Sequence, residues 1–446
     1  MQYQRFGRIS GTENTVRSAG IFTNQNFSYD NRYLCDLTCR LDGSSLYGRK
    51  QRQTPYWSVG LRWNIDNERF LKRHPIVNRL VLRANIGTTG NQNYTRNQAS
   101  NMYSYLPRVY GGHFGAVVPT LANPDLHGQT TYNRNLGFET SLFGNRLNFE
   151  LNLYYNSTKG NLTSVTIAPS VGYDSYKTNM GDLTNRGFDF SLSYSPIKTK
   201  DLLLNFTLNG TRNRNRIERI SDALLRYNDT VNKAAQNAEG NASTVFLFKE
   251  GESMNTIYAV RSLGIDPGTG HEIYLDRNGT PTYTWRAADQ VAVGVNEPTL
   301  QGYFGLNFRY KEWELGTNVN YSFGADKYNY TLHQKIENVD YMVNNDRRAL
   351  TERWQQPGDI ARYKAITDNS ATKATSRFVQ RENRLGMTSL RLSYTVPGQR
   401  LRRTWLSLLK FSLTANELFY LSTIRQERGL AYPFTRSATF SAQLHF

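Results

Sequence analysis

The last stretch of the chain, from Ala438 to Phe446, alternates between apolar and polar side chains at every residue. The apolar positions are Ala438, Phe440, Ala442, Leu444 and Phe446, and the polar positions between them are Thr439, Ser441, Gln443 and His445. This two-residue period is that of a β-strand. In a water-soluble sheet the apolar face meets a core, whereas in an outer-membrane barrel it meets lipid and the polar face lines a lumen. An aromatic last residue favours the barrel.

The same period recurs along the chain, in segments that end at turn residues. With the terminal segment, the thirteen expected strands are residues 16–27, 32–42, 56–63, 79–87, 132–143, 146–156, 184–194, 202–214, 301–310, 313–323, 384–396, 409–416 and 435–446. A weaker segment at 2–9 would make fourteen. Two tight hairpins are expected, one through Gly144 and Asn145 and one through Lys311 and Glu312.

The connections between these segments alternate in length. The long ones are residues 43–55, 88–131, 157–183, 215–300, 324–383 and 417–434, and the short ones are residues 28–31, 64–78, 144–145, 195–201, 311–312 and 397–408. Bacterial barrels have long extracellular loops and short periplasmic turns, and a soluble sandwich has no reason to keep this parity. We therefore predict an all-β, antiparallel, up-and-down transmembrane β-barrel, with a small extra hairpin within residues 255–263 and 272–285.

Composition agrees with this fold class. Only 38% of the 446 residues are hydrophobic, while 13% are aromatic, and the mean hydropathy is −0.61. A globular core of this size is usually richer in aliphatic residues, but a barrel needs apolar side chains only at alternate positions. The net charge of +18 comes from basic residues that are scattered along strand edges and turns, so we expect no nucleic-acid partner.

The sequence contains no pattern typical of catalysis or metal binding. The six histidines are dispersed, and Cys35 and Cys39 would lie ~13 Å apart on one strand, too far for a disulfide. Asp276, Asn278 and Gly279 resemble part of a calcium loop but lack its later glutamate, so an ordinary turn is the better interpretation. We expect no enzyme activity, no cofactor and no metal.

Several short runs resemble a known family. They are Tyr33-Leu34, Arg40-Leu41-Asp42-Gly43-Ser44-Ser45, Trp57-Ser58-Val59-Gly60, Glu68-Arg69-Phe70-Leu71, Leu80 to Gly87 with Thr89-Gly90-Asn91-Gln92, Asn123-Pro124-Asp125-Leu126, Asn185-Arg186-Gly187-Phe188, Gly264-Ile265-Asp266-Pro267, Ser389 to Pro397, and Ala415-Asn416-Glu417-Leu418. Each run is common by itself. Together, in this order and over most of the chain, they resemble the barrel of SusC/RagA-type TonB-dependent transporters.

The resemblance implies an outer-membrane barrel of Bacteroidetes-like bacteria that imports oligosaccharides, or sometimes peptides, beneath a SusD-like surface lipoprotein. In that family the TonB complex supplies energy through a box at the start of the chain, and a plug domain fills the lumen. We find no signal peptide, TonB box or plug in residues 1–446, and roughly eight strands fewer than the 22 of large plugged transporters. We therefore expect the C-terminal part of a receptor barrel, located in the cell outer membrane, in contact with its lipid, and inactive alone.

Aromatic residues in the expected loops are the candidate ligand contacts. They are Tyr103, Tyr105, Tyr110, Phe114, Tyr283, Trp285, Trp354 and Tyr363. Flat rings can stack on sugars in a ligand site, but packing within the loops is the alternative that we favour at each single position. In the closing strand, Phe440, Leu444 and Phe446 are expected to form an outer-membrane insertion signal.

Two other functions remain open at this stage. An exported β-rich adhesin could bind glycans without moving them, and it would purify as a stable monomer without detergent. A secreted β-sheet enzyme acting on polysaccharide would need paired carboxylates at glycosidase spacing. The sequence offers no convincing pair, so the adhesin is the stronger alternative to the transporter.

Overall fold

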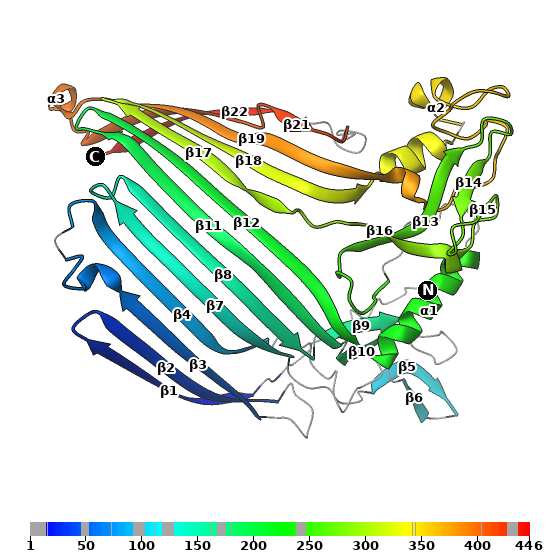
Figure 1. Ribbon diagram of the computed structural model, residues 1–446, viewed down its shortest axis with the longest axis horizontal. Helices are drawn as coiled ribbons and strands as arrows, with labels where there is room; N and C mark the ends of the chain where they lie inside the picture. Colours follow the sequence, from blue (N-terminus) through cyan, green and yellow to red (C-terminus); the bar gives the residue numbers. More distant parts are fainter. Residues whose placement is uncertain are drawn as a thin grey trace, which may run out of the picture.

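One curved antiparallel sheet of 14 strands dominates the computed structural model of the chain (Figure 1). The structure describes residues 15, 17–45, 53–72, 74–91, 103–111, 113–117, 129–160, 162–166, 175–179, 181–237, 247–340, 342–343, 345–402, 404–425 and 436–446. The main path of the sheet runs in chain order through β1 (Ser18–Tyr29), β2 (Tyr33–Ser44), β3 (Gln53–Asn64), β4 (Val77–Asn91), β7 (Gln129–Leu142), β8 (Leu147–Lys159), β11 (Gly181–Lys198), β12 (Leu202–Ile220), β17 (Leu300–Tyr310), β18 (Trp313–Tyr328), β19 (Val379–Thr395), β20 (Leu408–Asn416) and β22 (Ser437–His445). The short strand β21 (Tyr420–Ser422) pairs with β19 beside this path.

The thirteen strands expected from the sequence correspond one to one with the strands of the main path. The up-and-down antiparallel order is therefore confirmed, and the weak segment at 2–9 lies outside the described residues. Several strands reach further than expected at their long-connection ends: β12 continues to Ile220 and β18 to Tyr328, while β19 begins at Val379. At these ends charged residues such as Arg216, Asp326 and Arg381 interrupt the regular apolar alternation, while ladder hydrogen bonding continues.

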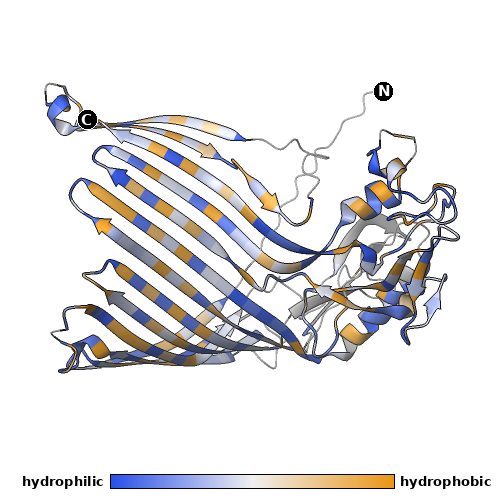
Figure 2. Cartoon of the chain, turned by 45° about the horizontal axis from the view of Figure 1, so that its top comes forward, coloured by the Kyte–Doolittle hydropathy of each residue, from blue (hydrophilic) through white to orange (hydrophobic). Residues whose placement is uncertain are grey.

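The two faces of the sheet differ in polarity, as Figure 2 shows in the alternating colours along each strand. On one face Leu151 of β8 lies opposite Phe190 of β11, and on the other face Asn152 lies opposite Asp189. Because alternate residues share a face, residues that lie opposite one another on neighbouring strands form a register row. Each register row is either apolar or polar across several strands. We call these the apolar face and the polar face.

Aromatic rings gather on the apolar face at the short-turn ends of the strands. Tyr33 stacks on Trp63 with ring centroids 6.4 Å apart, and Trp313 lies 4.8 Å from Tyr394. Rings in these positions match the interfacial girdle of membrane barrels, where one edge of the ring is apolar and the other is wet.

One aromatic residue on the apolar face is unusually well covered. Tyr321 of β18 is 9% exposed, whereas Phe304 on the neighbouring strand is 39% exposed. Tyr321 lies opposite Gly302, which in turn lies opposite Gly210, and its hydroxyl donates to the carbonyl oxygen of Asn209 at 2.8 Å. The two glycines leave room for the ring to lie across β17 and reach β12.

The long connections fold at one end of the sheet (Figure 1). A second sheet contains β15 (Pro281–Thr282), β14 (Glu272–Leu275), β13 (Thr256–Ile265) and β16 (Gln290–Val295), in that order. With η3 (Ala287–Asp289), the π-helical turn η4 (Leu332–Glu337), α2 (Arg348–Thr351) and η5 (Ser376–Phe378), it forms what we call the loop cap, residues 254–299 and 329–378. Strands β13 and β14 confirm the extra hairpin expected in this connection.

Other elements in the connections were not expected. The helix α1 (Asp222–Asn237) follows β12, and two hairpins, β5 (Ser104–Tyr110) with β6 (His113–Val117) and β9 (Leu162–Thr166) with β10 (Ser175–Asn179), lie in earlier long connections. The short turns hold η1 (Ile65–Asn67) and α3 (Gly398–Leu401). Within the described part of the chain, no helix has the length and apolar character needed to cross a bilayer.

Candidate functional site

Charged side chains on the polar face are linked across β4, β7, β8 and β11. The guanidinium of Arg83 lies 3.0 Å from a carboxylate oxygen of Glu139 and 2.8 Å from one of Glu150. The amide of Asn152 donates to Glu150 at 3.2 Å and to Asp189 at 3.0 Å. These contacts order the side chains while leaving part of their donors and acceptors facing open space.

A cavity of about 420 Å³ lies over this network. Its lining combines Arg83 and Asp189 with amide side chains, including Asn85 and Asn152. Gly137 keeps the floor open, because a Cβ atom there would lie 2.9 Å from the side-chain oxygen of Asn152. Amide donors and acceptors side by side suit a ligand rich in hydroxyl or peptide groups.

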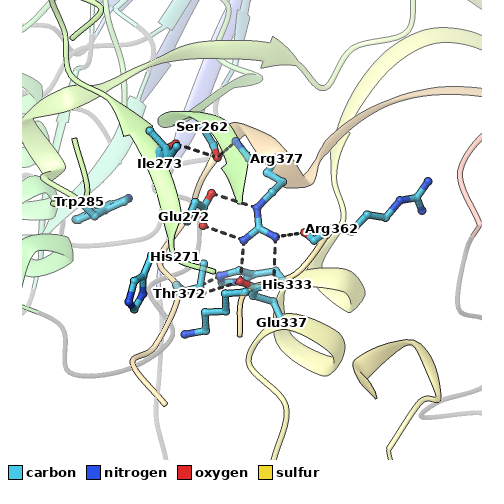
Figure 3. Close-up of polar contacts among 12 residues, drawn as sticks. Ser262, His271, Glu272, Ile273, Trp285, His333, Glu337, Arg362, Thr372 and Arg377 are labelled. Atoms are coloured by element: carbon cyan, nitrogen blue, oxygen red, sulfur yellow. Dashed lines mark hydrogen bonds and ion pairs between the residues drawn. The ribbon is translucent and has the colours of Figure 1, made fainter. Parts of the chain in front are cut away.

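A buried ion-pair cluster holds the loop cap together (Figure 3). The guanidinium of Arg377 lies 2.8 Å from Glu272 of β14 and 2.7 Å from Glu337 of η4, and both carboxylate side chains are at most 2% exposed. Arg377 also donates to the carbonyl oxygen of Arg362 at 2.5 Å, and Thr372 donates to Glu337 at 3.0 Å. Although burial opposes its charge, the two carboxylates raise the pKa of Arg377 above its ordinary value.

His333 lies beside this cluster and is fully buried. Its Nε2 lies 2.8 Å from the carbonyl oxygen of Thr372, so that nitrogen carries a proton and donates. The other ring nitrogen has no partner among the residues that the structure describes. Burial lowers the pKa of His333 below 6.5, although Glu337 and Glu272 act in the opposite direction. Above pH 6.5 the ring is therefore neutral in the folded cap.

A second buried cation fixes the backbone of the cap. Arg353 is 4% exposed and donates to the carbonyl oxygens of Ala349, Lys364, Ile336 and Glu337. These acceptors belong to three segments that are separate in the chain. The cap is thus held by charged side chains as well as by its apolar core, which contains Ile257, Ile336, Tyr363 and Phe378 among others.

Four of the candidate ligand contacts lie in the loop cap. Tyr283 is 58% exposed, and its hydroxyl donates to Asp266 at 2.6 Å. The half-buried Trp285 donates to the carbonyl oxygen of Ala374 at 3.1 Å and has the ammonium of Lys373 4.9 Å from its ring centroid.

The other two candidates in the cap are less open. Trp354 donates to the carbonyl oxygen of Pro267 at 2.9 Å, with Gly270 against its ring. Tyr363 is 4% exposed in the apolar core, the environment of the packing alternative. In this group, Tyr283 has the accessible ring.

The remaining candidates lie elsewhere. Tyr103 is 66% exposed. The backbones of Tyr105, Tyr110 and Phe114 belong to β5 and β6, and their side chains lie outside the described part of the structure.

Two of the expected insertion-signal residues share the apolar face of β22, and the third, Phe446, follows its last residue. Phe440 is 69% exposed and stacks on Phe411 at 6.1 Å. Leu444 lies opposite Leu409, and the ring of Phe446 stacks on Trp405 at 4.5 Å. The exposure of these side chains is consistent with contact with lipid, and their role as a signal stays a prediction.

The sequence analysis missed the polar-face network and the buried cluster of the cap. The network could have been found by pairing the expected strands, since Arg83, Glu139 and Glu150 all occupy polar positions of neighbouring strands. The cluster of Arg377 has no such signal, because its partners are distant in sequence and belong to loops. The described residues contain no group of three or more side chains that could hold a metal ion.

Comparison with known proteins matches this architecture. The sequence profile of the family described as TonB dependent receptor-like, beta-barrel matches residues 2–416. TonB-dependent receptor SusC of Bacteroides thetaiotaomicron is 29% identical over 74% of this chain and 34% of its own length. TonB-dependent receptor P39 of Formosa agariphila is 23% identical over 92% of this chain and 43% of its own length. The chain thus spans less than half the length of these relatives.

Solved structures give the same result for the fold. A structure of the RagAB peptide transporter superposes with a TM-score of 0.82 at 20% identity, covering 96% of this chain and 48% of the other. RagAB in an open-open state superposes with a TM-score of 0.80. This chain belongs to the TonB-dependent receptor-like β-barrel family of outer-membrane proteins, and its relatives are of the SusC/RagA type.

Proposed function

We propose that this chain forms part of the wall of an importer that takes oligosaccharides or peptides across the outer membrane. The observation that carries the proposal is the curved sheet, which has one apolar and one polar face. In fold, 96% of this chain superposes on the RagAB peptide transporter. The amide-lined cavity around Asn152 supports it, because hydroxyl and peptide groups are the chemistry that such a wall would meet.

The same proposal includes two partners. A SusD-like surface lipoprotein would close over the loop cap, and the TonB complex would supply energy through another part of the complete protein. The buried ion pairs of Arg377 support a cap firm enough to serve as a docking rim. Among the candidate rings that the structure describes, Tyr103 and Tyr283 have enough exposure to meet a ligand.

Uptake by living cells tests this function. The gene is deleted in the native host, and the strain is grown on defined oligosaccharides and peptides while uptake of labelled forms is measured. We expect loss of uptake for one ligand class, restoration by the wild-type gene, and weaker restoration by Tyr283→Ala than by Tyr310→Ala, a matched change of an exposed tyrosine on the apolar face of the sheet. Normal uptake of every ligand, with loss of cell attachment to glycans, would instead support the adhesin.

A further inference from the structure

A row of arginines crosses the apolar face near the long-connection end of the sheet. Arg134 of β7 lies opposite Tyr155 of β8, Tyr155 lies opposite Arg186 of β11, and Arg186 lies opposite Arg214 of β12. Arg212 lies two residues nearer the short turns on the same face of β12, and all four guanidinium groups belong to exposed residues. We call these four arginines the arginine row.

The row lies directly beyond apolar side chains. Two residues further along β7, β8 and β11 toward the short turns are Leu136, Leu153 and Phe188, which share a register row. Positions two apart on a strand point to the same face and lie ~7 Å apart. The arginines therefore stand at the edge of the surface that meets lipid, on the side of the extracellular loops.

A hollow in the apolar face leads to this row. It has a volume of about 470 Å³ and an almost wholly apolar lining, with Arg134 and Tyr155 at one end. The hollow forms because Ala84 of β4 stands between Leu61 and Leu136, whose longer side chains rise on both sides of it. Its shape and lining suit a hydrocarbon chain rather than a polar ligand.

The arginines of the row have no direct carboxylate partner in the described part of the chain. Among the described residues, none of the four arginines forms an ion pair with an acidic side chain, and the guanidinium of Arg134 instead lies 5.4 Å from the ring centroid of Tyr155. By contrast, Arg216, further out on β12, lies 3.9 Å from Glu218.

Carboxylates line a separate cavity of about 320 Å³ on the loop side of the row. Glu218, Glu252 and Glu297 belong to that lining together with Arg186 and Arg214. The acidic groups thus lie on the side of the loops. Among the described residues that line the apolar hollow there is no carboxylate, so a lipid anion that approaches from the membrane meets positive charge first.

We propose that the arginine row and the hollow over Ala84 bind one phosphorylated lipid of the outer leaflet. Guanidinium groups bind phosphate with two parallel hydrogen bonds and in a fixed geometry. In this site Arg134, Arg186 and Arg214 bind the phosphate, and an acyl chain fills the hollow between Leu61 and Leu136. The site adds an anchor that fixes the height of the barrel in the membrane, independently of what the barrel imports.

Native mass spectrometry tests the proposal on the protein as it is extracted from the outer membrane. The probes are phosphorylated lipid A, the same lipid after removal of its phosphates, and inorganic phosphate. We expect phosphorylated lipid A to bind at least tenfold more tightly than the dephosphorylated form, with affinity that falls as salt rises. Millimolar inorganic phosphate should not displace it.

Two variants separate the two parts of the site. Arg186→Gln with Arg214→Gln should weaken binding of phosphorylated lipid A at least tenfold and leave the dephosphorylated lipid unchanged. Ala84→Leu, which fills the hollow, should weaken both lipids several-fold. Arg400→Gln with Arg402→Gln removes the same charge from exposed residues at the short-turn end and should change neither.

Folding of each variant is checked by heat-modifiable migration on gels. Equal binding of the two lipids would overturn the proposal, as would unchanged binding by the double arginine variant. Full displacement by inorganic phosphate would also overturn it, since the row would then be a site for a free anion.

Discussion

Arg377 shows how single side chains organise the loop cap. Its two carboxylate partners come from β14 and η4, which are far apart in the sequence and meet only in the folded cap. When one member of a buried charge cluster is removed, the remaining charges stay buried without an opposite charge. The resulting loss of stability is larger than the stability that the intact cluster adds relative to apolar residues in the same places. The cap should therefore be sensitive to this residue in particular.

Arg377→Met should open the loop cap without unfolding the sheet. Glu272 and Glu337 would remain buried and unpaired, which destabilises the cap by about 3–5 kcal/mol. Hydrogen exchange in residues 329–378 measures this opening. The control is Arg362→Met, whose side chain is 81% exposed in its ion pair with Glu352 and should change stability by about 0–1 kcal/mol. Equal protection in both variants would contradict the prediction.

His333 should make the cap sensitive to mild acid. Its pKa is lowered by burial, so below pH 6.5 the unfolded segment binds a proton that the folded cap does not. The contribution of the neutral His333 ring to the stability of the cap is fully present above pH 6.5 and is lost as the pH decreases below that value. Glu337 and Glu272 favour the protonated ring and reduce the effect, while Arg377 adds to it.

Hydrogen-exchange rates of the backbone amides of the cap at pH 7.5 and 5.5 test this prediction. Each rate is first corrected for the pH dependence of exchange in an unfolded chain. The native cap should lose protection at the lower pH, and His333→Gln, which keeps a donor but cannot titrate, should remove the difference. His271→Gln changes an exposed histidine and should leave the difference in place. A pH dependence that persists in His333→Gln would assign the effect to other groups.

At the scale of the element, the hairpin of β17 and β18 depends on a close approach. A Cβ atom at Gly302 would collide with the carbonyl oxygen of Asn209 and lie 2.8 Å from the hydroxyl of Tyr321. Gly316 of β18 has no heavy atom within 4 Å of the same hypothetical position. The two glycines therefore differ in packing although both lie within the same hairpin.

Gly302→Leu should destabilise the sheet, and Gly316→Leu should not. The added side chain at Gly302 must displace Tyr321 from its position across β17, an overpacking cost of about 1–3 kcal/mol. Urea unfolding of the complete barrel in detergent measures both variants. Similar midpoints for the two would show that the ring of Tyr321 moves aside at little cost.

The sequence predicted the elements well where alternation carried information. Every strand of the main path was expected, because apolar and aromatic side chains alternate with polar ones along most of these strands. The outer part of β12 was missed because Asn215 and Arg216 interrupt the apolar alternation after Arg214. The outer part of β18 was missed because Gly324, at positive φ, shifts the register after Phe323. Helix α1 was missed because its residues, Asp222–Asn237, are mostly polar and lie in a segment interpreted as a loop.

At the scale of the whole molecule, the parity of connection lengths was the decisive sequence signal. It predicted which end of the sheet carries the loops, and Figure 1 shows the cap, α1 and the small hairpins together at that end. The packing of the cap could not be predicted, since Tyr363, Arg353 and Arg377 acquire their surroundings from distant segments. The same holds for the candidate ligand rings, whose exposure depends on those contacts.

The length of β12 has a consequence for where the protein meets its surroundings. Its 19 residues are about twice the number that a strand needs to cross hydrocarbon. With a tilt of about 45°, the surplus raises the outermost backbone ~20 Å above the acyl chains. The cap then stands well above the membrane, and large molecules reach it before they reach the lipid.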